Sequence, residues 1–70
     1  MKNTRVENNL DMVFFKDLIK PLTSKEQDII TYKYALNYSD IEIANIFNIS
    51  RQSVNKTKIR ALDKLRLKYN

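Results

Sequence analysis

The chain has 70 residues, 43% of them hydrophobic and 30% charged, and this composition fits one small folded domain. It contains no cysteine, histidine or glycine, which excludes disulfide bridges, imidazole or thiolate catalysis, the usual zinc ligands and glycine-rich phosphate loops. The net charge of +5 is uneven: residues 1–50 carry six basic and seven acidic residues, whereas residues 51–70 carry seven basic residues and one acidic residue.

The first predicted helix runs from about Glu7 to Lys20, behind a disordered arm at residues 1–6, and Pro21 ends it. Apolar residues recur at helical spacing on the face that we assign to the core, namely Leu10, Val13, Phe14 and Leu18. Phe15 and Ile19 lie on a neighbouring face, so the helix is apolar on two sides. Phe14 and Phe15 are core candidates. Alternatively, Phe15 and Ile19 form a partner contact, such as the interface with a second copy of the chain.

The second predicted helix begins at a capping box. Thr23 and Glu26 have the spacing at which the hydroxyl and the carboxylate satisfy each other's backbone donors. The apolar pattern continues to about Leu36, and a turn at residues 37–38 follows. This segment is expected to pack against the rest of the domain as one continuous helix.

A second capping box, residues 39–42, opens a short helix that ends near Phe47. Asn48 tolerates the left-handed conformation that lets the chain leave a helix. Ser50 is then the N-cap of the last helix, which runs from Arg51 to about Tyr69. We assign the inner face of this last helix to Val54, Ala61, Leu62 and Leu65.

A helix of about eight residues, a three-residue turn and a second helix make a helix-turn-helix over residues 39–68. Ala44 is small where the two helices cross. The predicted wedge between them consists of Ile43, Phe47, Ile49 and Val54. Because the last helix also carries the basic charge, we predict that it contacts a polyanion and lies in the major groove of DNA.

With Val54 inward, a helical wheel places the outward face of the last helix on Arg51, Gln52, Asn55 and Lys56. Arginine bonds guanine bidentately, glutamine and asparagine bond adenine, and lysine bonds guanine or phosphate. Ser53 and Lys58 are expected to touch phosphate oxygens. The complete predicted DNA-binding set is Ser50, Arg51, Gln52, Ser53, Asn55, Lys56, Lys58 and Arg60.

Five segments resemble region 4 of the sigma-70 family, the promoter −35 element-binding domain of bacterial sigma factors. They are Leu22-Thr23-Ser24-Lys25-Glu26, Ile29-Ile30, Tyr38-Ser39-Asp40-Ile41-Glu42-Ile43-Ala44, Phe47-Asn48-Ile49-Ser50-Arg51 and Arg60-Ala61-Leu62-Asp63-Lys64-Leu65-Arg66. The resemblance covers about residues 10–67. It implies that Arg51, Gln52 and Lys56 contact bases, and that the first two helices bind the flap of the polymerase β subunit.

The sequence departs from the family at Thr57, where an aliphatic residue is usual, and at Ser53 and Lys56, which are uncommon choices. No segment resembling region 2 precedes the domain, so we expect an excised domain or a free-standing relative rather than a complete sigma factor. LuxR-type domains also begin with Leu-Thr-x-x-Glu, but they normally end in a Lys-Leu-Gly turn that is absent here. They remain the second family alternative.

We therefore predict an all-α fold of about four helices that binds double-stranded DNA sequence-specifically in bacterial or phage transcription control. We expect no catalysis, no cofactor and no metal, because the chain lacks the groups that would supply them. The absence of a membrane-spanning run and of an export signal favours the cytoplasm. The alternative function is an RNA polymerase-binding adaptor or another protein-interaction module with the same fold.

Overall fold

The computed structural model of the chain describes residues 12–69. Residues 12–18 form a first helical segment. The elements that follow are α2 (Ser24–Ile30), the π-helical η1 (Thr31–Ala35), α3 (Asp40–Phe47) and α4 (Arg51–Tyr69). No strand occurs within residues 12–69, and the all-α prediction is confirmed. The expected arm at residues 1–6 and the start of the first helix at Glu7 lie outside the described residues.

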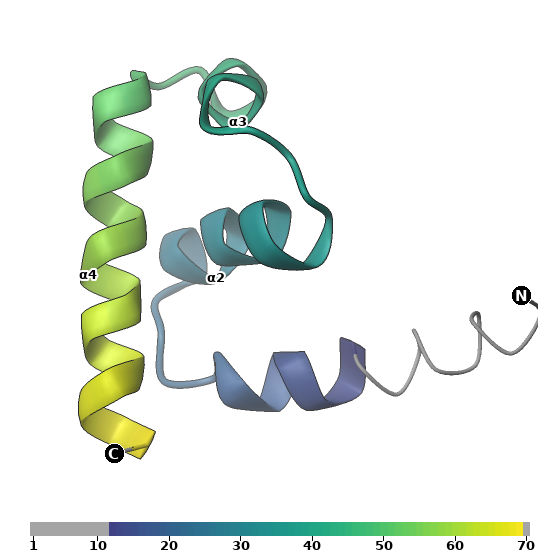
Figure 1. Cartoon of the computed structure of the whole chain (residues 1–70), viewed down its shortest axis with the longest axis vertical. Helices are drawn as coiled ribbons and strands as arrows, with labels where there is room; N and C mark the ends of the chain where they lie inside the picture. The colour runs from purple at the N-terminus through teal and green to yellow at the C-terminus, as the bar shows by residue number, and fades with distance from the viewer. Residues whose placement is uncertain (1–11, 70) are drawn as a thin grey trace, which may run out of the picture.

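Helix α4 is the longest helix of the described residues, and the other helical elements lie along one side of it (Figure 1). Its 19 residues span about 28 Å at 1.5 Å per residue. Beside it, α3, α2 and residues 12–18 are stacked in that order, from the N-terminal to the C-terminal end of α4 (Figure 1). The first half of α4 thus lies beside α3 and α2 (Figure 1).

Two separate clusters of buried side chains hold this arrangement together. One lies at the N-terminal half of α4 and consists of Ile29, Ile43, Ala44 and Val54, with Tyr32, Phe47 and Ile49 packed against it. The other lies towards the C-terminal half and consists of Ile19, Leu22, Ile30 and Ala61, with Phe15 and Leu65 packed against it. The neighbours Ile29 and Ile30 of α2 point into different clusters, so α2 joins the two halves.

The second predicted helix is not continuous to Leu36 as an α-helix. It is α-helical to Ile30 and then makes a π turn, in which the Leu36 backbone N–H donates to the Thr31 carbonyl oxygen at 3.0 Å. This wider turn accompanies the aromatic contacts of Tyr32, whose ring centroid lies 5.2 Å from that of Tyr38 and 5.1 Å from that of Phe47. The helix propensities of residues 31–36 do not predict this turn, because the aromatic contacts involve residues further along the chain.

The face assigned to the core in the first helical segment is wrong at Val13, Phe14 and Leu18, whereas Leu10 lies outside the described residues. Phe14 is 64% exposed, and Val13 and Leu18 are also exposed. Ile19 is only 4% exposed and lies in the second cluster, and Phe15 is half-buried against the same cluster. The predicted partner-binding residues Phe15 and Ile19 therefore belong to the core side, because they are the residues that meet Ala61 and Leu65 of α4.

The inner face of α4 is confirmed at Val54 and Ala61, which are fully buried, and at Leu65, which is half-buried. Leu62 was also assigned inward but is 39% exposed. Thr57 is buried at 4% exposure, so the threonine that departs from the family pattern still occupies an inner position. Within residues 12–69, no helix combines the length and apolar composition that crossing a bilayer requires.

Candidate nucleic-acid interface

The turn between α3 and α4 has the geometry that the sequence predicts. Asn48 adopts φ 56° and ψ 48°, in the left-handed region. The Ile49 backbone N–H donates to the Ala44 carbonyl oxygen at 2.9 Å, and the Asn48 N–H donates to the Asn45 carbonyl oxygen at 3.3 Å. These two bonds form a Schellman motif, and Ile49 packs into the cluster that contains Ala44. The turn therefore fixes the direction in which the chain leaves α3.

All three predicted helix caps are confirmed. The Thr23 Oγ1 atom accepts from the Glu26 backbone N–H at 3.2 Å, and the Glu26 Oε1 atom accepts from the Thr23 N–H at 3.0 Å. Ser39 and Glu42 form the same reciprocal pair at 3.1 and 2.8 Å. The Ser50 Oγ atom accepts from the Ser53 backbone N–H at 3.0 Å at the start of α4. Each helix of the motif thus begins at a defined residue.

The first turns of α4 separate into a buried and an exposed side. Val54 and Thr57 face the core. The residues predicted to read bases are all exposed on the other side of the helix, namely Arg51, Gln52, Asn55 and Lys56. Because Val54 and Thr57 are buried on the opposite side, α4 is oriented about its axis so that these four side chains face solvent together.

The remaining predicted contacts differ in their surroundings. Arg60 is exposed, and Ser53 is half-buried next to the cap. The Ser50 hydroxyl is engaged as the N-cap. Lys58, which the sequence predicts to touch phosphate oxygens, is only 16% exposed in its side chain, and its Nζ atom lies 3.2 Å from Asp40 Oδ2. Lys58 is therefore part of an ion-pair network with α3.

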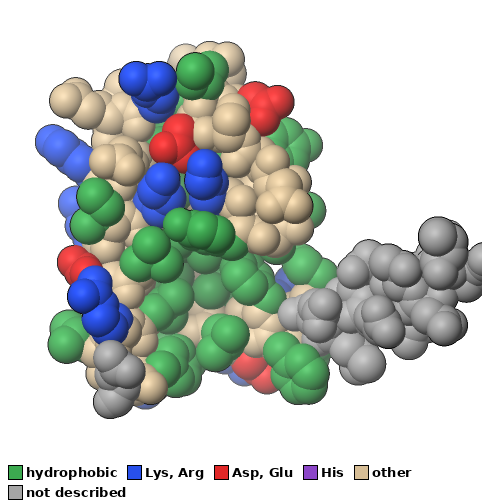
Figure 2. All heavy atoms as spheres, in the orientation of Figure 1, with side chains coloured by type: hydrophobic (Ala, Val, Ile, Leu, Met, Phe, Trp, Pro, Cys, Tyr) green, Lys and Arg blue, Asp and Glu red, His purple; other side chains and the backbone are tan. Residues whose placement is uncertain are grey.

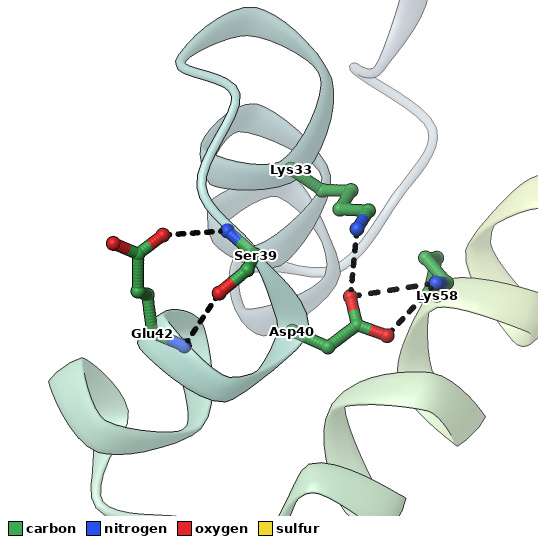
Figure 3. A network of polar contacts seen from close by, with 5 residues as sticks. All are labelled: Lys33, Ser39, Asp40, Glu42 and Lys58. Carbon is green, nitrogen blue, oxygen red and sulfur yellow. Dashed lines mark hydrogen bonds and ion pairs between the residues drawn. The ribbon is translucent and has the colours of Figure 1, made fainter.

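Asp40, the first residue of α3, is the centre of this network (Figure 3). Its Oδ1 atom lies 3.0 Å from Lys33 Nζ, and its Oδ2 atom lies 3.2 Å from Lys58 Nζ. The network joins η1, α3 and α4. The roles of Lys33 and Asp40 in this network could not be predicted from the sequence, because Asp40 and Lys58 are 18 positions apart on different helices and no local spacing relates them.

Basic side chains gather over the upper part of α4 and beside α3, above a band of hydrophobic side chains in the middle of the same face (Figure 2). Among residues 12–69, no group of three or more histidine, cysteine, aspartate or glutamate side chains is placed to hold a metal ion. The arrangement consists of cations and amides on an exposed helix, which is suited to contacts with the edges of bases and with phosphates.

Residues 18–67 match the family described as Sigma-70, region 4. The chain belongs to the sigma-70 region 4 family. Its family-level role is therefore transcription-related DNA binding, in a class of regulators that are not enzymes. The resemblance predicted from the sequence is confirmed, and the match assigns the chain to region 4 rather than to the LuxR-type alternative.

Two curated relatives are also similar to this region 4 chain. A protein named RNA polymerase sigma factor TcsR, from Paraclostridium sordellii, is 44% identical over 70 residues, which are 100% of this chain and 40% of the relative. A protein named bacteriocin UviA, from Clostridium perfringens, is 43% identical over 61 residues, which are 87% of this chain and 31% of the relative. The chain thus spans 40% or less of the length of these relatives. No solved structure matches it.

Proposed function

We propose that this region 4 chain binds double-stranded DNA sequence-specifically, in bacterial or phage transcription control, with the first turns of α4 in the major groove. The observation that carries the proposal is the joint exposure of Arg51, Gln52, Asn55 and Lys56 on a helix whose opposite side is buried at Val54. In a helix-turn-helix, the N-terminal residues of the second helix contact base edges and the first helix crosses the phosphate backbone.

The side chains divide into two roles under this proposal. Arg51, Gln52, Asn55 and Lys56 read bases, because their types match the donor and acceptor pattern of the major groove. Ser53 and Arg60 contact phosphates that flank the groove and set the register of the domain without reading sequence. The Ser50 hydroxyl acts through the helix, because it caps α4 and so orients its first turn.

Selection from a pool of duplexes with a randomised centre tests this function. The chain is expected to enrich one short motif over successive rounds, and fluorescence anisotropy is expected to show tighter binding to that motif than to a shuffled duplex. An unselected control pool carried through the same rounds without protein identifies amplification bias. A chain that binds duplexes but enriches no motif contradicts sequence-specific recognition.

RNA polymerase binding is a second proposed function, which the exposed side of the first helical segment favours. Val13, Phe14 and Leu18 are between 48% and 64% exposed on the first helical segment, although burial of such side chains is favourable. A single helix-turn-helix module buries roughly 600–1,000 Å² of its surface on DNA, which seldom gives tight specific binding alone. We infer that the polymerase β flap, which the family resemblance implies as a partner, supplies the additional contact.

A further inference from the structure

Lys58 continues the row of α4 side chains that includes two of the proposed base readers. Arg51, Asn55 and Lys58 follow one another at the i, i+4, i+7 spacing that places side chains on one face of a helix. Lys58 lies about 4.5 Å further along the helix axis than Asn55, at 1.5 Å per residue. The Lys33–Asp40–Lys58 network is therefore at the edge of the proposed DNA-reading surface.

The network contains more positive than negative charge. Asp40 contributes one carboxylate, whose Oδ1 atom lies 3.0 Å from Lys33 Nζ and whose Oδ2 atom lies 3.2 Å from Lys58 Nζ. Two ammonium groups against one carboxylate leave a net charge of +1. The three side chains are only 16–27% exposed and lie against one another where η1, α3 and α4 meet (Figure 3).

The carboxylate remains charged under physiological conditions. The hydrogen bond from Lys33 is the largest influence on the pKa of Asp40 and lowers it, burial opposes this, and Lys58 lowers the pKa further. Asp40 is also the first residue of α3, where the helix dipole favours a negative charge. Two lysines and a helix N-terminus thus stabilise an anion at the end of the helix that crosses the DNA backbone in a helix-turn-helix.

We propose that Lys33 and Lys58 form a phosphate-backbone contact outside the base-reading set, and that Asp40 limits the strength of this contact to about one net charge. This inference rests on the proposed DNA-binding function. A contact to phosphate carries no sequence information, so it adds equally to the affinity for selected and random duplexes. By neutralising one of the two lysines, Asp40 restrains sequence-independent binding while the α4 side chains read bases.

The test compares Asp40→Asn with Asp17→Asn, a control that removes the same charge from another ion pair. The Asp17 Oδ1 atom lies 3.4 Å from Lys20 Nζ. This pair is at the end of the first helical segment, which lies beside the C-terminal end of α4, whereas α3 lies beside its N-terminal end. In Asp40→Asn, the slope of log Kd against log salt concentration is expected to increase by about 0.9. At 0.1 M salt, this variant is expected to bind random and selected duplexes alike roughly five- to tenfold more tightly than the wild-type chain. The control is expected to leave the slope unchanged.

A second variant tests the contact from the opposite direction. Lys33→Met leaves Asp40 paired with Lys58 alone and brings the network to zero net charge, so the salt slope is expected to fall by about 0.9. The double variant D40N/K58M has the wild-type charge of +1 and is expected to restore the wild-type slope. Thermal unfolding confirms that each variant is folded, and Lys33→Met decides the question if Asp40→Asn does not fold.

The outcomes separate this inference from the proposed function. If the wild-type chain selects a DNA motif but Asp40→Asn gives the same slope as Asp17→Asn, the phosphate contact is overturned and sequence reading stands. An unchanged slope for Lys33→Met overturns it as well. If the wild-type chain binds no duplex at all, both the function and the inference fail.

Discussion

Lys64 Nζ lies 2.9 Å from Oε1 of Glu26, a carboxylate whose side chain is only 4% exposed. The pair joins the N-terminus of α2 to the C-terminal half of α4, and the same carboxylate accepts the Thr23 backbone N–H in the capping box. Burial alone would raise the pKa of Glu26, but the hydrogen bonds from Lys64 and Thr23 and the charge of Lys64 outweigh it and lower the pKa below 4.5. The ionised form is thus favoured in the folded chain.

This relationship predicts how stability depends on pH. A carboxyl group with a lower pKa in the folded than in the unfolded chain stabilises the fold above the unfolded value, and this contribution is lost as pH falls through the folded value. Glu26→Gln is therefore expected to lower the free energy of unfolding by about 1–2 kcal/mol at pH 7 and to flatten its decrease below pH 4.5. Urea denaturation at a series of pH values between 3 and 7 measures both effects.

The control for this prediction is Asp63→Asn, because Asp63 is exposed and pairs with Arg66, three positions further along the surface of α4. It is expected to change stability very little, since exposed ion pairs contribute little. A Glu26→Gln variant with the wild-type dependence on pH would show that the buried carboxylate does not stabilise the fold.

Salt is expected to weaken duplex binding steeply. With four to six phosphate contacts, log K falls by about 0.9 per contact for each unit of log salt, so raising salt from roughly 50 to 200 mM weakens binding about a hundredfold or more. Anisotropy titrations at four or five salt concentrations give the slope directly. Binding that is independent of salt would rule out an interface built on the basic residues of α4.

Arg51→Ala and Lys68→Ala form a contrasting pair, because both remove one exposed cation from α4. Arg51→Ala is expected to cost about 1–3 kcal/mol on the selected duplex and to relax preference at one base pair. Lys68→Ala, near the end of the helix, is expected to weaken all duplexes slightly and equally. The affinities of both variants for selected and random duplexes provide the measurement, and identical behaviour of the two would contradict the assignment of the recognition surface.

Phe14→Asp and Ile19→Asp separate the exposed from the buried side of the first helical segment. Phe14 is 64% exposed, so Phe14→Asp is expected to preserve thermal stability while weakening the association with purified core RNA polymerase in a pull-down. Ile19 is 4% exposed, and Ile19→Asp is expected to unfold the domain, because it places a charge in the second cluster. Unchanged polymerase binding by a folded Phe14→Asp variant would exclude this face as the contact.

The features that the sequence predicted correctly depend on residues close together in the chain. The caps at Thr23, Ser39 and Ser50 each involve a partner three positions away, and the left-handed turn depends on Asn48 itself. The exposed face of α4 could be predicted from a helical wheel once Val54 was placed inward. Whether these residues contact DNA stays a prediction.

The features that the sequence did not predict depend on contacts between separate elements. The first helical segment has apolar residues on two faces, and helical periodicity alone does not show which face is buried. Phe15 and Ile19 face inward because they pack in the same cluster as Ala61 and Leu65. The Glu26–Lys64 pair spans 38 positions, and helical periodicity carries no information about it. The same holds for the π turn, whose aromatic contacts join η1 to α3 and to the connection between these two elements.

The two clusters of buried side chains have a consequence for how such a domain changes over time. Among the described residues, no buried side chain belongs to both clusters, and α2 and α4 are the elements that contribute to each. A substitution at Ile19 or Leu22 therefore perturbs the packing of the end that carries Phe14, while Ile43 and Val54 keep their own neighbours around the α3–α4 turn. Mutations can accumulate at the proposed protein-binding end and leave the proposed DNA-reading end intact, so a lineage can acquire a new partner before it acquires a new target sequence.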